Sequence, residues 1–172
     1  MRHFNILPIF IATALLVGCG GDDYSTVELK HYALDNVAGV LARSMVELDD
    51  MVTYDGGGSF KIRTDDSIVI TLFETGDIDI EKARLIYQAM VRTENLDGKV
   101  YLEMWCCFDN KGEYFSRDLK TPLSGTVEWA SEETPFFLQK GQNPDNVKLN
   151  LVITGPGTIW IDDIRLLKAP LM

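Results

Sequence analysis

Hydrophobic side chains recur at every second position over much of the chain, most clearly near its end. In residues 147–153 the odd-numbered positions are Val, Leu, Leu and Ile, and lysine, asparagine and a further valine stand between them. This period of two is typical of a half-buried β-strand. Residues 155–157 read Gly-Pro-Gly, and Ile159 and Ile161 then resume the alternation, so we expect a closing hairpin. The pattern slips by one position at Asp162-Asp163, which predicts a β-bulge.

Other alternating runs fill the chain before this hairpin. Further strands are expected at residues 29–34, 46–48, 60–62, 67–73, 85–93, 99–108, 113–117, 126–130 and 136–138. The Asp-Gly pair at residues 97–98 predicts a hairpin between the two longest of them. Short strands, frequent turn signals and no long helical pattern favour one all-β domain, a two-sheet antiparallel β-sandwich.

Two stretches resemble a known family of such sandwiches. Residues 157–166, GTIWIDDIRL, resemble the closing strand of galactose-binding-like jelly rolls, which include many carbohydrate-binding modules of polysaccharide-degrading enzymes. Residues 58–62, GSFKI, are similar to the beginning of an early core strand in these domains. The resemblance implies a jelly-roll sandwich over residues 29–168. It says little about function, because the closing strand holds the sandwich together and not the sugar.

The first residues have a different pattern. Arg2 and His3 precede an apolar run over residues 4–17, which is too short for a comfortable membrane span and typical of a signal peptide. The run ends in Leu-Val-Gly-Cys at residues 16–19, which resembles a bacterial lipobox. The resemblance implies a signal peptide at residues 1–18, cleavage before Cys19, and acylation of its thiol, with palmitate among the expected acyl chains.

Residues 19–28 then provide the lipidated cysteine and a tether, and membrane lipid becomes a partner through Cys19. The residues after Cys19 are glycines and not the aspartate that often marks inner-membrane retention, so we expect the outer membrane of a bacterial envelope. The alternative is an ordinary signal peptide, or a short anchor, with an incidental cysteine.

Charge and cysteine content narrow the possible partners. The formal net charge is -10, and it becomes -11 when residues 1–18, with Arg2 as their one cation, are removed. Without a basic cluster, nucleic acid is not an expected partner. Beyond Cys19 only Cys106 and Cys107 remain. Neighbouring residues of a strand point to opposite faces, so we expect one buried thiol and one more exposed thiol and no disulfide between them.

Catalytic motifs are missing from the sequence. His31 is the only histidine beyond the expected signal peptide, and there is no Gly-x-Ser-x-Gly elbow, phosphate-binding loop or HExxH motif. Pairs of adjacent acids are frequent, but such pairs in loops usually serve to solvate a surface. We therefore expect no enzymatic activity and no required cofactor.

Sugar binding would use aromatic rings, whose apolar faces stack on pyranose rings. In residues 99–108, Tyr101, Glu103 and Trp105 share one strand face, a mixture that suits a sugar platform. Gln88 and Arg92 of the preceding strand are expected beside it as hydrogen-bond donors. The alternative is that the two aromatic side chains pack against the second sheet or a loop.

Two other aromatic residues, Trp129 and Tyr114, stand near predicted loops and are candidates for the rim of this site or for packing. Trp160 alternates with Ile159 and Ile161, and we expect it to be structural.

A structural calcium ion is the last candidate. Modules of the resembled family often hold one where their first and last strands meet. Calcium takes six to eight oxygen ligands, and Asp163 with Asp49 or Asp50 would supply part of that shell. Surface acids beside a bulge explain the same residues without a metal.

The sequence therefore favours a lipid-anchored, non-catalytic envelope protein whose β-sandwich binds a glycan. The alternative is an envelope lipoprotein of the same fold with a structural or protein-interaction role and no sugar ligand. A glycan-active enzyme is the third reading, and it would need two carboxylates facing one cleft.

Overall fold

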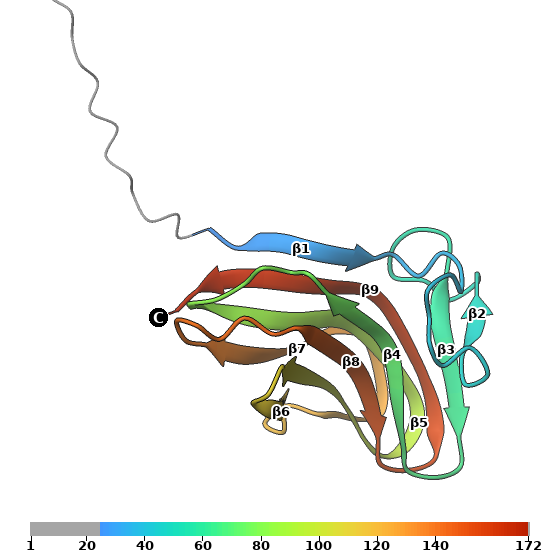
Figure 1. Ribbon diagram of the computed structural model, residues 1–172. Coiled ribbons are helices and arrows are strands. Elements are labelled where there is room, and N and C mark those ends of the chain that lie inside the picture. The colour runs from blue at the N-terminus through green and yellow to red at the C-terminus, as the bar shows by residue number, and fades with distance from the viewer. Residues whose placement is uncertain (1–24, 172) are drawn as a thin grey trace, which may run out of the picture.

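The computed structural model describes residues 25–171, and every regular element in them is a β-strand (Figure 1). The strands are β1 (Val27–Tyr32), β2 (Glu47–Asp49), β3 (Ser59–Thr64), β4 (Ile68–Gly76), β5 (Ala83–Phe108), β6 (Gly112–Arg117), β7 (Leu123–Leu138), β8 (Asn146–Ile153) and β9 (Gly157–Pro170). The all-β prediction is confirmed. The expected signal peptide, Cys19 and residues 20–24 of the tether lie outside the described residues. No helix within residues 25–171 has the length and apolar character needed to cross a membrane.

Hydrogen bonds join the nine strands into one antiparallel sheet, which curls so that two halves face each other (Figure 1). We call one half the first sheet. In it, one edge of β9 pairs with the beginning of β5, and the other edge pairs with β1 and β3. The outermost strands are β7, which pairs with β5, and β2, which pairs with β3. The second sheet has the order β4, β8, the end of β5, β6. Buried side chains from both sheets form one hydrophobic cluster between them.

Strand β5 is continuous where the sequence predicted a hairpin. Its residues 83–94 pair with β9, whereas residues 100–107 pair with β8, so the strand passes from the first sheet into the second. The chain crosses again at residues 154–157. There β8, which pairs with β4 and β5, leads into β9, which pairs with β1, β3 and β5. Both predicted hairpins are therefore wrong, because each turn carries the chain between sheets.

The two crossings lie against each other. The Asp97 backbone N–H donates to the Pro156 carbonyl oxygen at 2.8 Å, and the Thr154 N–H donates to the Lys99 carbonyl oxygen at 2.9 Å. A Cβ atom added to Gly155 would overlap the Asp97 carbonyl oxygen. The contact between the crossings therefore requires glycine at position 155.

Strand β7 is also longer than predicted. It unites the two expected strands 126–130 and 136–138 and pairs along β5, with Pro135 opposite Ile86. Among the described strands, β7 pairs by backbone hydrogen bonds only with β5. A proline is tolerated in such an edge strand, because the edge that lacks a partner needs no N–H donor.

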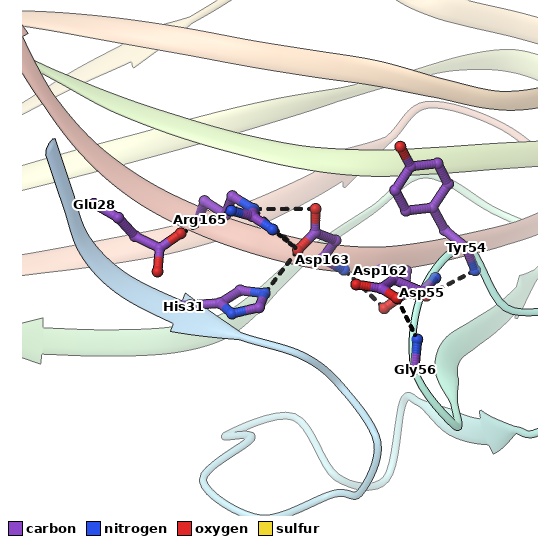
Figure 2. A network of polar contacts seen from close by, with 8 residues as sticks. All are labelled: Glu28, His31, Tyr54, Asp55, Gly56, Asp162, Asp163 and Arg165. Atoms are coloured by element: carbon purple, nitrogen blue, oxygen red, sulfur yellow. Dashed lines mark hydrogen bonds and ion pairs between the residues drawn. The ribbon is translucent and has the colours of Figure 1, made fainter. Parts of the chain in front are cut away.

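The predicted bulge at Asp162-Asp163 is present and anchors two segments (Figure 2). Asp163 has a positive φ of 48°. Its carboxylate accepts from His31 Nε2 of β1 at 2.7 Å and pairs with Arg165 at 2.9 Å, and Arg165 pairs with Glu28 at 2.8 Å. We call these four residues the β1 clasp. Burial opposes ionisation of Asp163, but Arg165 and His31 outweigh it, so the pKa of Asp163 lies below its usual value.

Asp162 holds a loop at the same bulge. It is fully buried, and its carboxylate accepts from the backbone N–H groups of Tyr54 at 2.8 Å and Asp55 at 3.2 Å (Figure 2). Burial raises the pKa of Asp162, although these N–H groups oppose the rise. The bulge therefore fixes both β1 and the loop before β3 to β9.

Candidate functional site

The outer face of the second sheet carries a row of polar residues beside a row of aromatic and charged residues. Glu103 of β5 has Asn150 of β8 and Arg117 of β6 as its cross-strand neighbours. Two residues further along, Trp105 is flanked by Lys148 of β8 and Phe115 of β6. We call this surface the platform face, and it comprises Glu103, Trp105, Phe115, Arg117, Lys148 and Asn150.

Glu103 organises the polar row. It is only 6% exposed, and it accepts from Trp105 Nε1 at 2.7 Å and from Asn150 Nδ2 at 3.2 Å. Arg117 Nε lies 3.3 Å from the second carboxylate oxygen. Hydrogen bonds to a charged acceptor are stronger than neutral ones, so this buried carboxylate fixes the orientation of the Trp105 indole and the Asn150 amide. Arg117 adds an ion pair, and its buried Nε has no hydrogen-bond partner among the described residues.

The aromatic row presents ring surface to solvent. Trp105 is half-buried and Phe115 is 48% exposed. Their ring centroids are 5.1 Å apart at an interplanar angle of 42°. The Arg117 guanidinium carbon lies 4.2 Å from the centre of the Phe115 ring, which holds that ring in place by a cation–π contact. The face thus combines positioned apolar rings with hydrogen-bonding groups, which is what recognition of a pyranose needs.

Charged groups border the aromatic row. Glu113 accepts from Lys148 Nζ at 3.1 Å and lies 3.3 Å from Cys107 Sγ. Burial and then Glu113 raise the pKa of the Cys107 thiol, and burial raises that of Cys106 to about 12. Both cysteines are free, Cys106 buried and Cys107 half-buried, as the alternation predicted. Protonated thiols in these surroundings are weak nucleophiles.

The other residues expected at this site are either buried or on the first sheet. Tyr101 is on the platform side of β5 but only 8% exposed, so it offers little ring surface to a ligand. Gln88 and Arg92 are on the first sheet, opposite Arg165 and Trp160 of β9. Their expected place beside Trp105 is wrong, because β5 crosses to the other sheet instead of turning back.

Trp129 is also outside the platform face. Its ring packs edge-on against that of Tyr54, with centroids 6.0 Å apart. Trp129 belongs to β7 and Tyr54 to the loop that Asp162 anchors, so this pair lies at the first sheet.

Trp160 is structural, as expected. It is 4% exposed, its Nε1 donates to Asp49 at 2.9 Å, and its ring lies 4.9 Å from Lys61 Nζ and 5.6 Å from the Arg92 guanidinium carbon. The hydrogen bond from Trp160 is the main cause that lowers the pKa of Asp49 to about 2.

The acids proposed for calcium do not fit a calcium shell. Asp163 is engaged by His31 and Arg165, and Asp49 by Trp160 and Lys61. Asp50 is exposed. Within the part of the chain that the structure describes, no three His, Cys, Asp or Glu side chains are grouped to hold a metal ion. Side chains of the protein itself already occupy the carboxylates of Asp163 and Asp49, which calcium would need.

Sequence reasoning missed four members of the platform face, which are Phe115, Arg117, Lys148 and Asn150. Each stands at an alternate position of a predicted strand, so the face of the strand on which it lies could be predicted from the sequence. Its cross-strand neighbours could not be predicted, because they depend on the pairing register.

Comparisons with known proteins bear on the fold. No protein-family model and no curated protein sequence matches the chain. Among solved structures, the CBM22-1 xylan-binding domain from Paenibacillus barcinonensis Xyn10C is similar over 88% of this chain and 100% of its own, with TM-score 0.58 and 11% identity.

Two more structures are similar. The CBM22-1–GH10 modules of Clostridium thermocellum Xyn10B, complexed with xylohexaose, match over 86% of this chain and 29% of that one, with TM-score 0.60 and 12% identity. A family 16 carbohydrate-binding module matches over 71% of this chain and 84% of its own, with TM-score 0.53 and 11% identity. The chain therefore has the β-sandwich fold of carbohydrate-binding modules.

Proposed function

We propose that this protein is a lipid-anchored, non-catalytic protein of the bacterial cell envelope that binds a glycan on its platform face. The observation that carries the proposal is the pair formed by Trp105 and Phe115, whose rings reach solvent beside the buried carboxylate of Glu103. Similar folds include a xylan-binding domain and modules complexed with xylohexaose, which supports a polysaccharide as the ligand.

The anchor rests on the sequence at residues 16–19, which resembles a lipobox. A single acyl chain holds a protein weakly at a membrane, so stable attachment would need the several chains typical of mature bacterial lipoproteins. In this arrangement the lipid provides the attachment and the β-sandwich provides the recognition.

A binding screen tests the glycan proposal. We expect the purified protein to bind a poly- or oligosaccharide, with xylohexaose in the panel, at a dissociation constant of about micromolar to millimolar, because the face is open and solvated. Trp105→Ala should remove most of the affinity. Tyr54→Ala is the matched control, because Tyr54 is 49% exposed but lies at the first sheet.

The two outcomes are distinct. Loss of binding in Trp105→Ala alone, with an unchanged melting temperature, supports the proposal. Absence of any glycan hit for the wild-type protein contradicts it and favours the role in protein interaction.

A further inference from the structure

Five aromatic rings line a groove at the edge of the sandwich, where β6 approaches β7. The rings are those of Phe108, Tyr114, Phe115, Phe136 and Phe137, and the groove has a volume of about 390 Å³. Tyr114 and Phe137 are each 55% exposed, so the groove is open to solvent. Close to it, Ser116 Oγ and Thr134 Oγ1 are 2.8 Å apart and tie the two strands together.

The polar groups of this groove already have partners within the protein. Tyr114 donates its hydroxyl hydrogen to the Lys111 carbonyl oxygen at 3.0 Å, and Lys111 Nζ lies 3.4 Å from the Gly141 carbonyl oxygen. Gln142 Oε1 accepts from the Gln139 N–H at 2.7 Å. These contacts use the hydroxyl hydrogen of Tyr114, one hydrogen of the Lys111 ammonium and the amide oxygen of Gln142. The rest of the lining is mainly ring surface.

Phe115 connects the groove to the platform face. It lines the groove, and its ring centroid is 5.1 Å from that of Trp105. A molecule that lies on Trp105 therefore reaches the groove across one ring, without leaving the protein surface.

From this continuity and this lining, we propose that the groove binds an apolar substituent, an aryl or acyl group, carried by the glycan on the platform face. The inference rests on the proposed glycan binding. An unsubstituted sugar suits the groove poorly, because the lining is mainly ring surface, where its hydroxyls would lose water and gain few protein partners. A second copy of this chain is disfavoured by the net charge of -10 that each copy carries.

Paired ligands test the proposal. The probes are 4-nitrophenyl and methyl glycosides of the same xylo-, gluco- and galacto-oligosaccharides, titrated into the purified protein by calorimetry. We expect at least one nitrophenyl glycoside to bind about tenfold or more tightly than its methyl counterpart. Phe137→Ser should remove this difference and leave the affinity for the methyl glycoside unchanged. Trp105→Ala should weaken both ligands.

Each other outcome overturns the inference. Equal affinities for the two glycosides in the wild-type protein would reject the groove while leaving the proposed function standing. Binding of neither ligand would reject both. A nitrophenyl preference that survives both Phe137→Ser and Tyr114→Ser would place the apolar group elsewhere. A concentration-dependent dimer that Phe137→Ser abolishes would assign the groove to self-association. The exposure of Phe137 favours a folded variant, and a thermal melt verifies it.

Discussion

At the scale of single residues, Glu103 and Glu132 show how differently two buried acids are used. Glu103 accepts hydrogen bonds from Trp105 and Asn150 and forms an ion pair with Arg117. Glu132 of β7 is 5% exposed and lies opposite Ala89, and burial and then Asp118 raise its pKa to about 7. The carboxylate of Glu103 orients its neighbours on the platform face, whereas ionisation of Glu132 destabilises the folded protein.

Replacing Glu103 tests the organisation of the platform face. Glu103→Gln keeps the size of the side chain but removes its negative charge. The ion pair with Arg117 is lost and the hydrogen bond from Trp105 is weakened. We therefore expect glycan affinity to fall about tenfold and the free energy of unfolding to fall by about 1–3 kcal/mol. Titration and thermal melts measure both. Glu47→Gln is the control, because Glu47 is exposed and lies on β2 of the first sheet, away from the platform face. Unchanged affinity in Glu103→Gln would refute the role of the carboxylate.

Glu132 predicts a dependence of stability on pH. Its pKa is raised to about 7 in the folded protein. Between about pH 4.3, the usual value for Glu, and pH 7 the native state holds a proton that the unfolded state has lost, so this residue lowers stability as pH rises. Glu132→Gln should flatten the decline and stabilise the protein at pH 8 by roughly 1–3 kcal/mol. Urea melts at pH 5 and pH 8 test this; the same slope for both proteins would contradict it.

At the scale of elements, the sequence located the strands but not their connections. Alternation placed β8 and β9 well, and the phase slip identified the bulge at Asp162-Asp163. A turn sequence such as Asp97-Gly98 permits positive φ, which a hairpin and a crossing both need. What distinguishes them is the contact between residues 94–98 and 154–157, which lie far apart in sequence. Phe115 was not predicted as the neighbour of Trp105, because that contact too joins two strands whose pairing is not evident from the sequence.

The contact between the two crossings is testable at Gly155. Gly155→Ala introduces a Cβ against the Asp97 carbonyl oxygen, and backbone cannot yield as a flexible side chain can. We expect a loss of roughly 2–4 kcal/mol of stability. Gly57→Ala is the control, because its Cβ would lie 3.6 Å from the nearest atom, a side-chain oxygen of Asp35. Equal melting temperatures for the two variants would show that the crossings are not tightly coupled.

At the scale of the whole molecule, the two outer faces have different tasks. The first sheet carries the β1 clasp and the packed Trp160, which hold the domain together. The second sheet carries the platform face, and β1, which follows the expected tether, is not part of it. The fold class could be predicted from hydrophobic alternation and turn signals, whereas the assignment of each strand to a sheet required the three-dimensional pairing.

The proposed attachment of the whole molecule depends on one thiol. Cys19→Ser should leave a precursor that is neither acylated nor processed, because the thiol accepts the lipid. Labelling of cells with a radioactive or clickable fatty acid measures this, with Cys107→Ser as the control for a thiol in the folded domain. Equal labelling of wild type and Cys19→Ser would contradict the anchor.

The central claim is that a glycan lies on Trp105, and the three tryptophans of the chain allow a direct measurement. Each indole N–H gives its own signal in a proton–nitrogen NMR spectrum. Trp105 is on the platform face, whereas Trp129 and Trp160 are at the first sheet. On titration with a glycan that binds in the screen, we predict that the Trp105 signal shifts with saturation and the other two stay in place. A bound glycan that shifts Trp129 or Trp160 and leaves Trp105 unmoved would contradict the account.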